Sequence, residues 1–159
     1  LSARAMGDFT VGKSKILPPI VGAIKALFDK YKIDYDDKYI VIVGAGKLVG
    51  KPVAIWLLNG KVSLSVVDER TQDISEFTKK ADIIISGVGK PGLITGDMIK
   101  EGAVVIDAGT SESAGKLVGD VDFDSVPQKA SFITPVPGGV GPLTVAMVYR
   151  NLLTLAGVK

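Results

Sequence analysis

The stretch from Tyr39 to Pro52, with the sequence YIVIVGAGKLVGKP, decides the fold. Its first five residues are apolar and mostly β-branched, which is typical of a strand buried on both faces of a parallel sheet. A glycine turn follows directly, and the next residues, 49–58, have the pattern of a helix that Asn59-Gly60 ends. A buried strand, a glycine turn and a helix in this order predict the first unit of an α/β fold.

Outward from this unit, short apolar strands alternate with helical patterns. We expect strands at 39–43, 62–67, 83–85, 103–106 and 131–133; helices at 18–31, 49–58, 74–80 and 142–155; and a helical turn at 95–99 with Thr95 as its N-cap. Residues 1–17 are predicted to form a connector, and residues 18–159 one domain. The alternation predicts a Rossmann-like parallel sheet with helices on both faces.

The composition excludes several kinds of chemistry. The 159 residues include no Cys and no His, which excludes disulfides, thiol nucleophiles, a Ser-His-Asp triad and a His-metal site. We therefore predict no catalytic residue and no metal ligand. The 19 basic and 17 acidic residues are mixed along the chain, so we expect no nucleic-acid partner. No apolar run approaches the roughly 20 residues that span a bilayer, so we expect no membrane association and a cytoplasmic location.

The glycine turn is a candidate phosphate-binding loop. Small residues let the backbone approach a ligand closely, and a helix N-terminus offers unpaired N–H groups and a partial positive charge. The spacing Gly-x-Gly-x-x-x-Gly, from Gly44 to Gly50, is one residue longer than the usual dinucleotide fingerprint, so a purely structural turn is the alternative. A nucleoside-triphosphate loop fits poorly, because Lys51 is followed by Pro52 where that loop needs Ser or Thr.

An acidic residue ends the second predicted strand. Asp68 lies 18 residues after Gly50, where an acid in dinucleotide folds accepts hydrogen bonds from the adenosine ribose. A solvated strand-end carboxylate is the alternative. Glu69 would add repulsion against a 2′-phosphate, whereas Arg70 would either bind that phosphate or face solvent.

Three further Gly- and Pro-rich loops follow predicted strands, at 87–92, 107–110 and 134–142. The last holds TPVPGGVGP, which is stiffer than an ordinary strand-to-helix turn requires. Parallel strands place their carboxyl ends at one edge of the sheet, where ligands of such folds bind. Four such loops on that edge favour a binding site over four ordinary turns.

Together these motifs resemble the bifunctional methylenetetrahydrofolate dehydrogenase/methenyltetrahydrofolate cyclohydrolase family, specifically its NAD(P)-binding domain. The matching stretches are VGKP at 49–52, VGKPG at 88–92, TGDM at 95–98, GAVVID at 102–107, GDVDF at 119–123 and ITPVPGGVGP at 133–142. The resemblance covers residues 18–156. It implies an oxidoreductase and hydrolase of one-carbon metabolism, which transfers hydride from methylenetetrahydrofolate to the cofactor and then hydrolyses the methenyl product.

The resemblance also implies a site. The residues implied to bind the cofactor, NAD or NADP, are Gly44, Ala45, Gly46, Lys47, Leu48, Val49, Gly50, Pro52, Asp68, Glu69, Arg70, Thr71, Val88, Gly89, Pro91, Gly109, Thr110 and Thr144; those implied to border the folate are Pro137, Gly138 and Gly139. The family usually has Arg where this chain has Ala45, and that Arg helps to bind the 2′-phosphate. NAD is therefore favoured over NADP.

No counterpart of the family's N-terminal domain, which holds the folate and the catalytic Lys, is present in this sequence. We expect the chain to be inactive alone, to share its folate substrate with that domain, and to form a homodimer when full length. A stand-alone, non-catalytic dinucleotide-binding or regulatory module is the alternative. A compact reductase ranks last, because Tyr35 and Lys38 are one residue too close for the Tyr-x-x-x-Lys motif.

Overall fold

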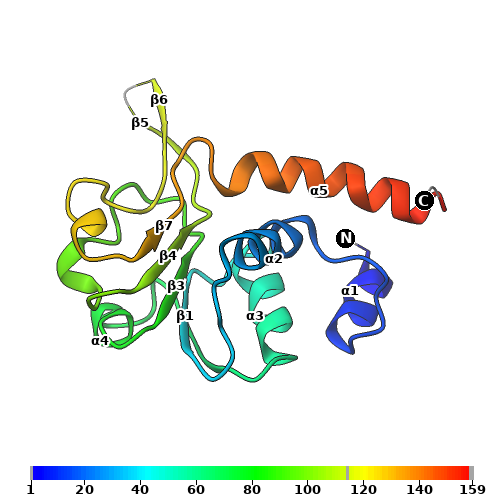
Figure 1. Cartoon of the computed structure of the whole chain (residues 1–159), viewed down its shortest axis with the longest axis horizontal. Coiled ribbons are helices and arrows are strands. Elements are labelled where there is room, and N and C mark those ends of the chain that lie inside the picture. Colours follow the sequence, from blue (N-terminus) through cyan, green and yellow to red (C-terminus); the bar gives the residue numbers. More distant parts are fainter. Residues whose placement is uncertain (1, 114, 158–159) are drawn as a thin grey trace.

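The structure is a computed structural model that describes residues 2–113 and 115–157 (Figure 1). In chain order its elements are α1 (Ala3–Thr10), α2 (Pro19–Tyr31), β1 (Tyr39–Val43), α3 (Gly50–Leu58), β2 (Ser63–Val67), α4 (Ser75–Thr78), β3 (Ile83–Ser86), the 3-10 turn η1 (Gly96–Met98), β4 (Val104–Asp107), β5 (Ser111–Ser113), β6 (Lys116–Val118), the 3-10 turn η2 (Val126–Gln128), β7 (Phe132–Ile133) and α5 (Val140–Leu155).

The five predicted strands form one parallel sheet in the order β2-β1-β3-β4-β7. Strand β1, the second strand of this order, pairs with β2 on one side and β3 on the other, so that Val43 at its carboxyl end lies beside Val67 and Ser86. The chain leaves β1 toward β2 and later returns to β3, which makes the carboxyl ends of β1 and β3 the point where the winding of the sheet reverses. Open α/β sheets bind ligands in the crevice at this point.

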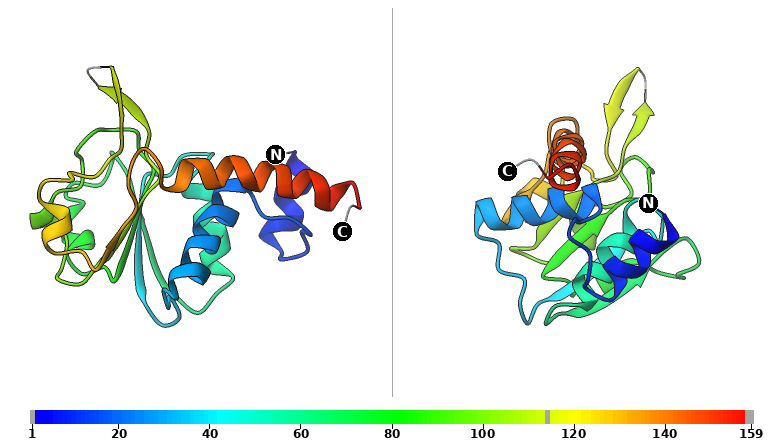
Figure 2. Two further views of the ribbon diagram at one scale, coloured as in Figure 1. Left: turned by 45° about the horizontal axis from the view of Figure 1, so that its top comes forward. Right: turned by 90° about the vertical axis from the view of Figure 1, so that its right-hand side faces the viewer.

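Alternate side chains of the sheet enter two separate cores. Ile40, Ile42 and Ile85 pack with α2 and α3, and the N-terminal part of α5 completes this layer. Val41 and Ile84 pack on the opposite face, against α4, η1 and η2. Figure 2 shows the long helices on one side of the sheet and the short ones on the other. The prediction of a Rossmann-like α/β sheet covered on both faces is confirmed.

The connector predicted at 1–17 contains a helix, α1, which the sequence analysis missed. The Ser2 hydroxyl caps it by accepting the N–H of Ala5. Phe9 is buried in the larger core and Met6 packs beside it. This segment therefore folds onto the domain instead of running free, because its apolar residues at positions 6 and 9 share one helical face.

Three other features differ from the expectations. An antiparallel hairpin, β5–β6, projects from the body of the molecule between β4 and β7 (Figure 1) and was not expected. Thr95 does precede η1, but its hydroxyl donates to the Asp97 carboxylate at 2.5 Å and makes no cap bond to the backbone. Helix α5 begins at Val140, two residues before the Pro142 that was expected to open it, because the first N–H groups of a helix need no intrahelical partner.

Candidate functional site

The three glycines of the first loop differ in what surrounds them. Gly44 has a left-handed backbone, with φ of +100°, and its N–H donates to the carbonyl of Val67 at 2.7 Å. A Cβ on Gly50 would lie 1.8 Å from the carbonyl oxygen of Gly44, so this glycine lets helix α3 approach the end of β1. A Cβ on Gly46 would have no atom within 4 Å. Gly46 therefore faces open space beside the loop, where a ligand can approach the backbone.

The N-terminus of α3 points toward this loop. No side chain caps it: Val49 at the N-cap position makes no side-chain hydrogen bond, and Pro52 has no N–H to donate. The N–H of Lys51 donates to the carbonyl of Gly46 at 3.0 Å, which closes the turn. The remaining N–H groups at the helix start and the positive end of the helix dipole suit an anion such as a pyrophosphate.

A cavity of about 590 Å³ adjoins the loop at the carboxyl ends of β2, β1 and β3. We call it the charged cavity, because Asp68, Glu69, Arg70, Asp73 and Lys90 lie on its wall. Its other lining residues are Val43, Gly44, Ala45, Gly46, Thr71, Gln72, Ile74, Gly87, Val88 and Leu93. Eight predicted cofactor contacts thus lie together here: Gly44, Ala45, Gly46, Asp68, Glu69, Arg70, Thr71 and Val88.

A tight turn after β2 holds the acidic wall of the charged cavity. The Asp68 carboxylate accepts the backbone N–H of Arg70 at 3.0 Å and its Nε–H at 3.2 Å, and it forms an ion pair with Nη2. The Thr71 hydroxyl accepts the N–H of Asp68 at 3.2 Å. The hydrogen bond from the Arg70 side chain lowers the pKa of Asp68, so this carboxylate is ionised at neutral pH. The Arg70 side chain is 82% exposed, which leaves it free to exchange partners.

A second cavity, of about 540 Å³, lies at the carboxyl ends of β4 and β7. We call it the proline cavity, because Pro135, Pro137 and Pro142 line it; its other lining residues are Ile20, Asp107, Ala108, Gly109, Thr110, Leu117, Val136, Gly138, Gly139, Val140, Gly141, Thr144 and Val145. The three predicted folate contacts, with Gly109, Thr110 and Thr144, lie together here. No Lys or Arg is among the lining residues, and the one carboxylate, Asp107, is 1% exposed.

Seven of the predicted contacts line neither cavity. Lys47, Gly89 and Pro91 are exposed beside the charged cavity, while Gly50 and Pro52 are buried under the loop and act in packing. Leu48 and Val49 line a third, apolar cavity of about 580 Å³.

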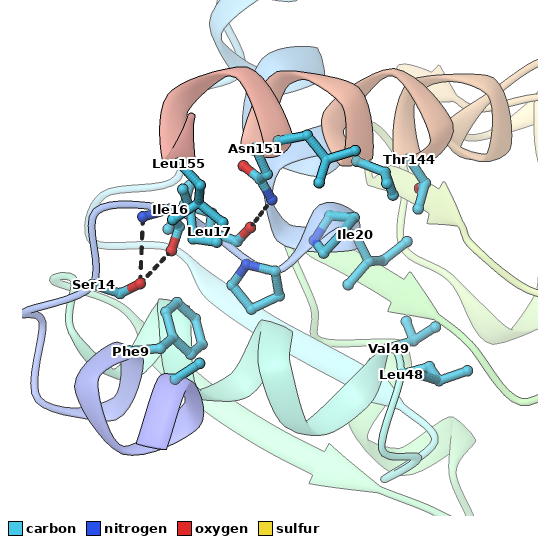
Figure 3. A pocket seen from close by; sticks show the side chains of 15 residues that line it. Phe9, Ser14, Ile16, Leu17, Ile20, Leu48, Val49, Thr144, Asn151 and Leu155 are labelled. Atoms are coloured by element: carbon cyan, nitrogen blue, oxygen red, sulfur yellow. Dashed lines mark hydrogen bonds between the residues drawn. The ribbon is translucent and has the colours of Figure 1, made fainter. Parts of the chain in front are cut away.

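This third cavity, which we call the apolar groove, lies between α1, the segment before α2 and one side of α5 (Figure 3). Its residues are Ala5, Phe9, Ser14, Ile16, Leu17, Pro18, Pro19, Ile20, Leu48, Val49, Thr144, Val148, Asn151, Leu152 and Leu155. The side-chain amide of Asn151 donates to the carbonyl of Leu17 at 2.8 Å and ties α5 to the segment below it. Several apolar side chains of α5, including Val148 and Leu152, are more than two-fifths exposed.

Two buried carboxylates, which the sequence analysis did not single out, link the loops after β3 and β4. Asp107 accepts the N–H groups of Gly109 (2.9 Å), Asp120 (3.1 Å) and Val121 (3.0 Å). Asp120 is fully buried and accepts hydrogen bonds from the loop after β3. Burial raises the pKa of Asp107, and the neighbouring Asp120 adds to this, while the three N–H groups act in the opposite direction. The signal available in the sequence was an acid at a strand end followed by a glycine two residues later.

The fold and the loops define a class: an α/β domain that binds a dinucleotide at the carboxyl edge of a parallel sheet. Residues 18–159 match the family described as tetrahydrofolate dehydrogenase/cyclohydrolase, NAD(P)-binding domain, and the chain belongs to this family. Over 130 residues it is 58% identical to the bifunctional protein FolD of Hydrogenobaculum sp. This match covers 82% of this chain and 47% of that protein.

Solved structures of the family superpose closely. The bifunctional enzyme FolD of Campylobacter jejuni is 43% identical with a TM-score of 0.90, covering 94% of this chain and 54% of that one. The Trypanosoma brucei enzyme, complexed with NADP cofactor and inhibitor, is 38% identical with a TM-score of 0.89, covering 96% of this chain and 55% of that one. The chain thus spans about half the length of the relatives it matches. The resemblance inferred from the motifs is confirmed.

Among residues 2–113 and 115–157, none of the helices has the length and apolar character needed to cross a membrane. No group of three or more acidic side chains in the same residues is placed to hold a metal ion.

Proposed function

We propose that this chain is the cofactor-binding half of a methylenetetrahydrofolate dehydrogenase/methenyltetrahydrofolate cyclohydrolase. The observation that carries the proposal is the pairing of the open Gly46 backbone and the uncapped α3 N-terminus with the charged cavity beside them. An anion at the helix start and a ribose at Asp68 would be bound by one continuous surface. The names of the relatives support the reaction assigned to the whole enzyme.

The residues present fit a nicotinamide dinucleotide. The loop from Gly44 to Gly50 would hold the pyrophosphate, because its backbone is approachable and its helix is uncapped. Asp68 and Val88 would border the adenosine in the charged cavity, and Gly109 and Thr110 would lie beside the nicotinamide in the proline cavity. When bound, the nicotinamide ring supplies the hydride acceptor. This chain's own residues would orient the cofactor and provide an apolar wall that excludes water from the nicotinamide.

The proline cavity would also receive one face of the folate. Pro137, Gly138 and Gly139 offer backbone and flat surface there, but no group that moves a proton at neutral pH. Asp107, whose carboxylate already accepts three backbone N–H groups, is committed to structure. We therefore place the proton-transferring residue on the other half of the enzyme, which would share the folate with this chain.

NAD is the cofactor we favour. Ala45 provides no cation where the family usually has Arg, and the charged cavity places Glu69 beside Asp68. Arg70 lies on the same cavity wall and could meet a 2′-phosphate, but its guanidinium is engaged with Asp68. Binding of NADP would require Arg70 to leave Asp68 and would leave two carboxylates near the phosphate. The Trypanosoma brucei relative, by contrast, was solved with NADP.

The apolar groove and the exposed face of α5 are proposed to contact the folate-binding half. Val145, Val148, Tyr149, Leu152 and Leu155 are each 44–66% exposed on one helix, and contiguous apolar surface of this kind marks interaction sites. The chain spans about half of each relative, so a partner of the right size exists in those proteins. We also propose a homodimeric full-length enzyme located in the cytoplasm; sedimentation of that enzyme and fractionation of its source cells test these two points.

Calorimetric titration of the purified chain with NAD, NADP and adenosine triphosphate tests the proposed function. We expect binding of NAD, weaker binding of NADP and no comparable binding of the triphosphate. Ala45→Arg is the matched variant: it should strengthen NADP binding and leave NAD binding little changed. A chain that is folded by circular dichroism but binds neither dinucleotide would contradict the proposal. Tighter binding of NADP than of NAD would leave the domain assignment intact and overturn the cofactor preference.

A further inference from the structure

We propose that Asp120 is a positioning residue that holds the loop after β3 in the shape that accepts the cofactor. The proposal rests on the proposed function, because it takes the charged cavity as the cofactor site. Asp120 lines neither cavity and touches no ligand position. It acts instead through the backbone of the loop that carries Val88 and Lys90, both of which line the charged cavity.

The Asp120 carboxylate occupies the place inside the loop after β3 that a bound anion could otherwise take. It accepts the N–H groups of Val88, Gly89 and Lys90, each at 2.8 Å. The hydroxyl of Ser86 donates to the same carboxylate at 2.7 Å. Successive backbone N–H groups that converge in this way form a concave anion site. Because Asp120 fills it, the N–H groups of Val88, Gly89 and Lys90 are unavailable to a phosphate, which favours the loop after β1 as the place where the phosphates bind.

The Asp120 carboxylate is closely packed. Asp120 is fully buried, and a Cβ on Gly109 would lie 2.2 Å from its carboxyl group. A Cβ on Gly119 would lie 2.0 Å from the carboxylate of Asp107, which itself accepts the N–H of Asp120. At both glycines, a carboxylate therefore occupies the space that a side chain would need.

The two aspartates make one connected arrangement across the carboxyl edge. Asp107 binds the loop after β4 through the N–H of Gly109, and it binds the segment after β6 through the N–H groups of Asp120 and Val121. Asp120 extends from this segment to the loop after β3. The loops that border the charged cavity and the proline cavity are thereby held at a fixed separation, as a dinucleotide that reaches into both requires.

The Asp120→Asn variant tests the proposal. Its amide keeps one oxygen, which can serve Gly89 and Lys90, while its NH2 can donate to Ser86 but faces the N–H of Val88. In a two-dimensional amide spectrum without ligand, we expect the Val88 signal to shift more than those of Gly89 and Lys90. A loop that holds its binding shape about a tenth of the time would weaken NAD binding about tenfold. Titrations are made well below the unfolding temperature of the variant.

Asp124→Asn is the matched control, since Asp124 is exposed on the same segment and its side chain makes no hydrogen bond among the described residues. It should change neither the Val88 signal nor NAD affinity. A folded Asp120→Asn variant that binds NAD as the wild type does would overturn the proposal. If this variant does not fold, Ser86→Ala decides: roughly threefold weaker binding supports the proposal, and unchanged binding overturns it. A wild-type chain that binds no dinucleotide would refute the proposed function instead.

Discussion

The charged cavity and the proline cavity lie on the same edge of one sheet, yet their lining residues differ in charge. The first has carboxylates and cations on its wall, including Asp68 and Arg70. The second is lined by Pro, Gly and aliphatic residues, and its single carboxylate, Asp107, is occupied by backbone N–H groups. Under the proposed function, the charged cavity would recognise the adenosine end of the cofactor, whereas the proline cavity would supply shape rather than acid–base chemistry.

The largest effect expected from this comparison is that the isolated chain, unlike a full-length relative, has no dehydrogenase turnover. Hydride transfer needs the folate carbon held about 3–3.5 Å from the nicotinamide, and the proline cavity has no Lys, no Arg and no exposed carboxylate among its lining residues to hold the folate there. We expect no methylenetetrahydrofolate-dependent cofactor reduction by the chain alone, measured by nicotinamide absorbance. A full-length relative is the positive control. Robust turnover by the chain alone would show that the proline cavity contains a catalytic group.

The next effect separates two glycines of the first loop. On the glycine spacing alone, Val at either Gly46 or Gly50 is expected to abolish cofactor binding in a folded domain. In the structure, the surroundings of these two glycines differ, and so do the expected effects of the two substitutions. A Cβ on Gly50 would lie 1.8 Å from Gly44, so Gly50→Val should destabilise the domain by more than the roughly 1–3 kcal/mol of ordinary overpacking. Gly46→Val meets open space and should remain folded, yet the added side chain blocks the approach of a pyrophosphate.

Thermal unfolding and titration with NAD distinguish the two variants. We expect a lower midpoint for Gly50→Val, and a normal midpoint with no detectable binding for Gly46→Val. Gly60→Ala, in the exposed turn after α3, is the matched glycine control and should bind normally. Undiminished affinity in Gly46→Val would mean that the loop after β1 is only a structural turn.

The sequence predicted those parts of the site that depend on local pattern. The strand, the glycine turn and the helix from Tyr39 to Leu58 are adjacent in the chain, so their periodicity and glycines were enough to place them. Asp68 was found because a strand-end acid has a fixed place in dinucleotide folds. The loops were assigned to one edge because parallel strands share their direction.

The parts that the sequence did not predict depend on contacts between distant residues. Asp120 hydrogen-bonds with residues 30 to 34 positions earlier, and no local pattern reports such a pairing. The hairpin strands at 111–113 and 116–118 are short and mostly polar, so they lack the apolar alternation that marks a strand. Helix α1 is short, and its place is fixed by the packing of Phe9 on the rest of the core.

A smaller effect is expected at Asp68. If its carboxylate accepts a hydrogen bond from the adenosine ribose, Asp68→Ala should weaken NAD binding by roughly 1–3 kcal/mol. The same change frees Arg70, whose guanidinium is then available to a 2′-phosphate. NADP binding should therefore fall less than NAD binding or increase, as measured by parallel titrations. Asp73→Ala, on the same cavity wall, is the control; equal losses for both cofactors would contradict a role at the ribose.

The smallest effect concerns a carboxylate at the opposite, amino edge of the sheet. Asp82 precedes β3, accepts the N–H of Tyr39 at 2.8 Å and forms an ion pair with Lys100. Since this site is far from both cavities along the strands, Asp82→Asn should leave NAD affinity unchanged. The pair is about one-third exposed, so its loss should lower the free energy of unfolding by no more than about 1 kcal/mol at neutral pH.

The pH dependence of that loss follows from the pKa of Asp82. The side-chain hydrogen bond from Lys100 lowers this pKa, with help from the N–H of Tyr39. A carboxyl group whose pKa is lowered by folding stabilises the protein above its ordinary value of 3.8, and this contribution disappears as the pH falls through the lowered value. Denaturation by urea at a series of pH values should therefore show wild type and Asp82→Asn separated at neutral pH and converging in acid. A separation that persists in acid would mean that Asp82 acts through packing, and altered NAD affinity would mean that the two edges of the sheet are not independent.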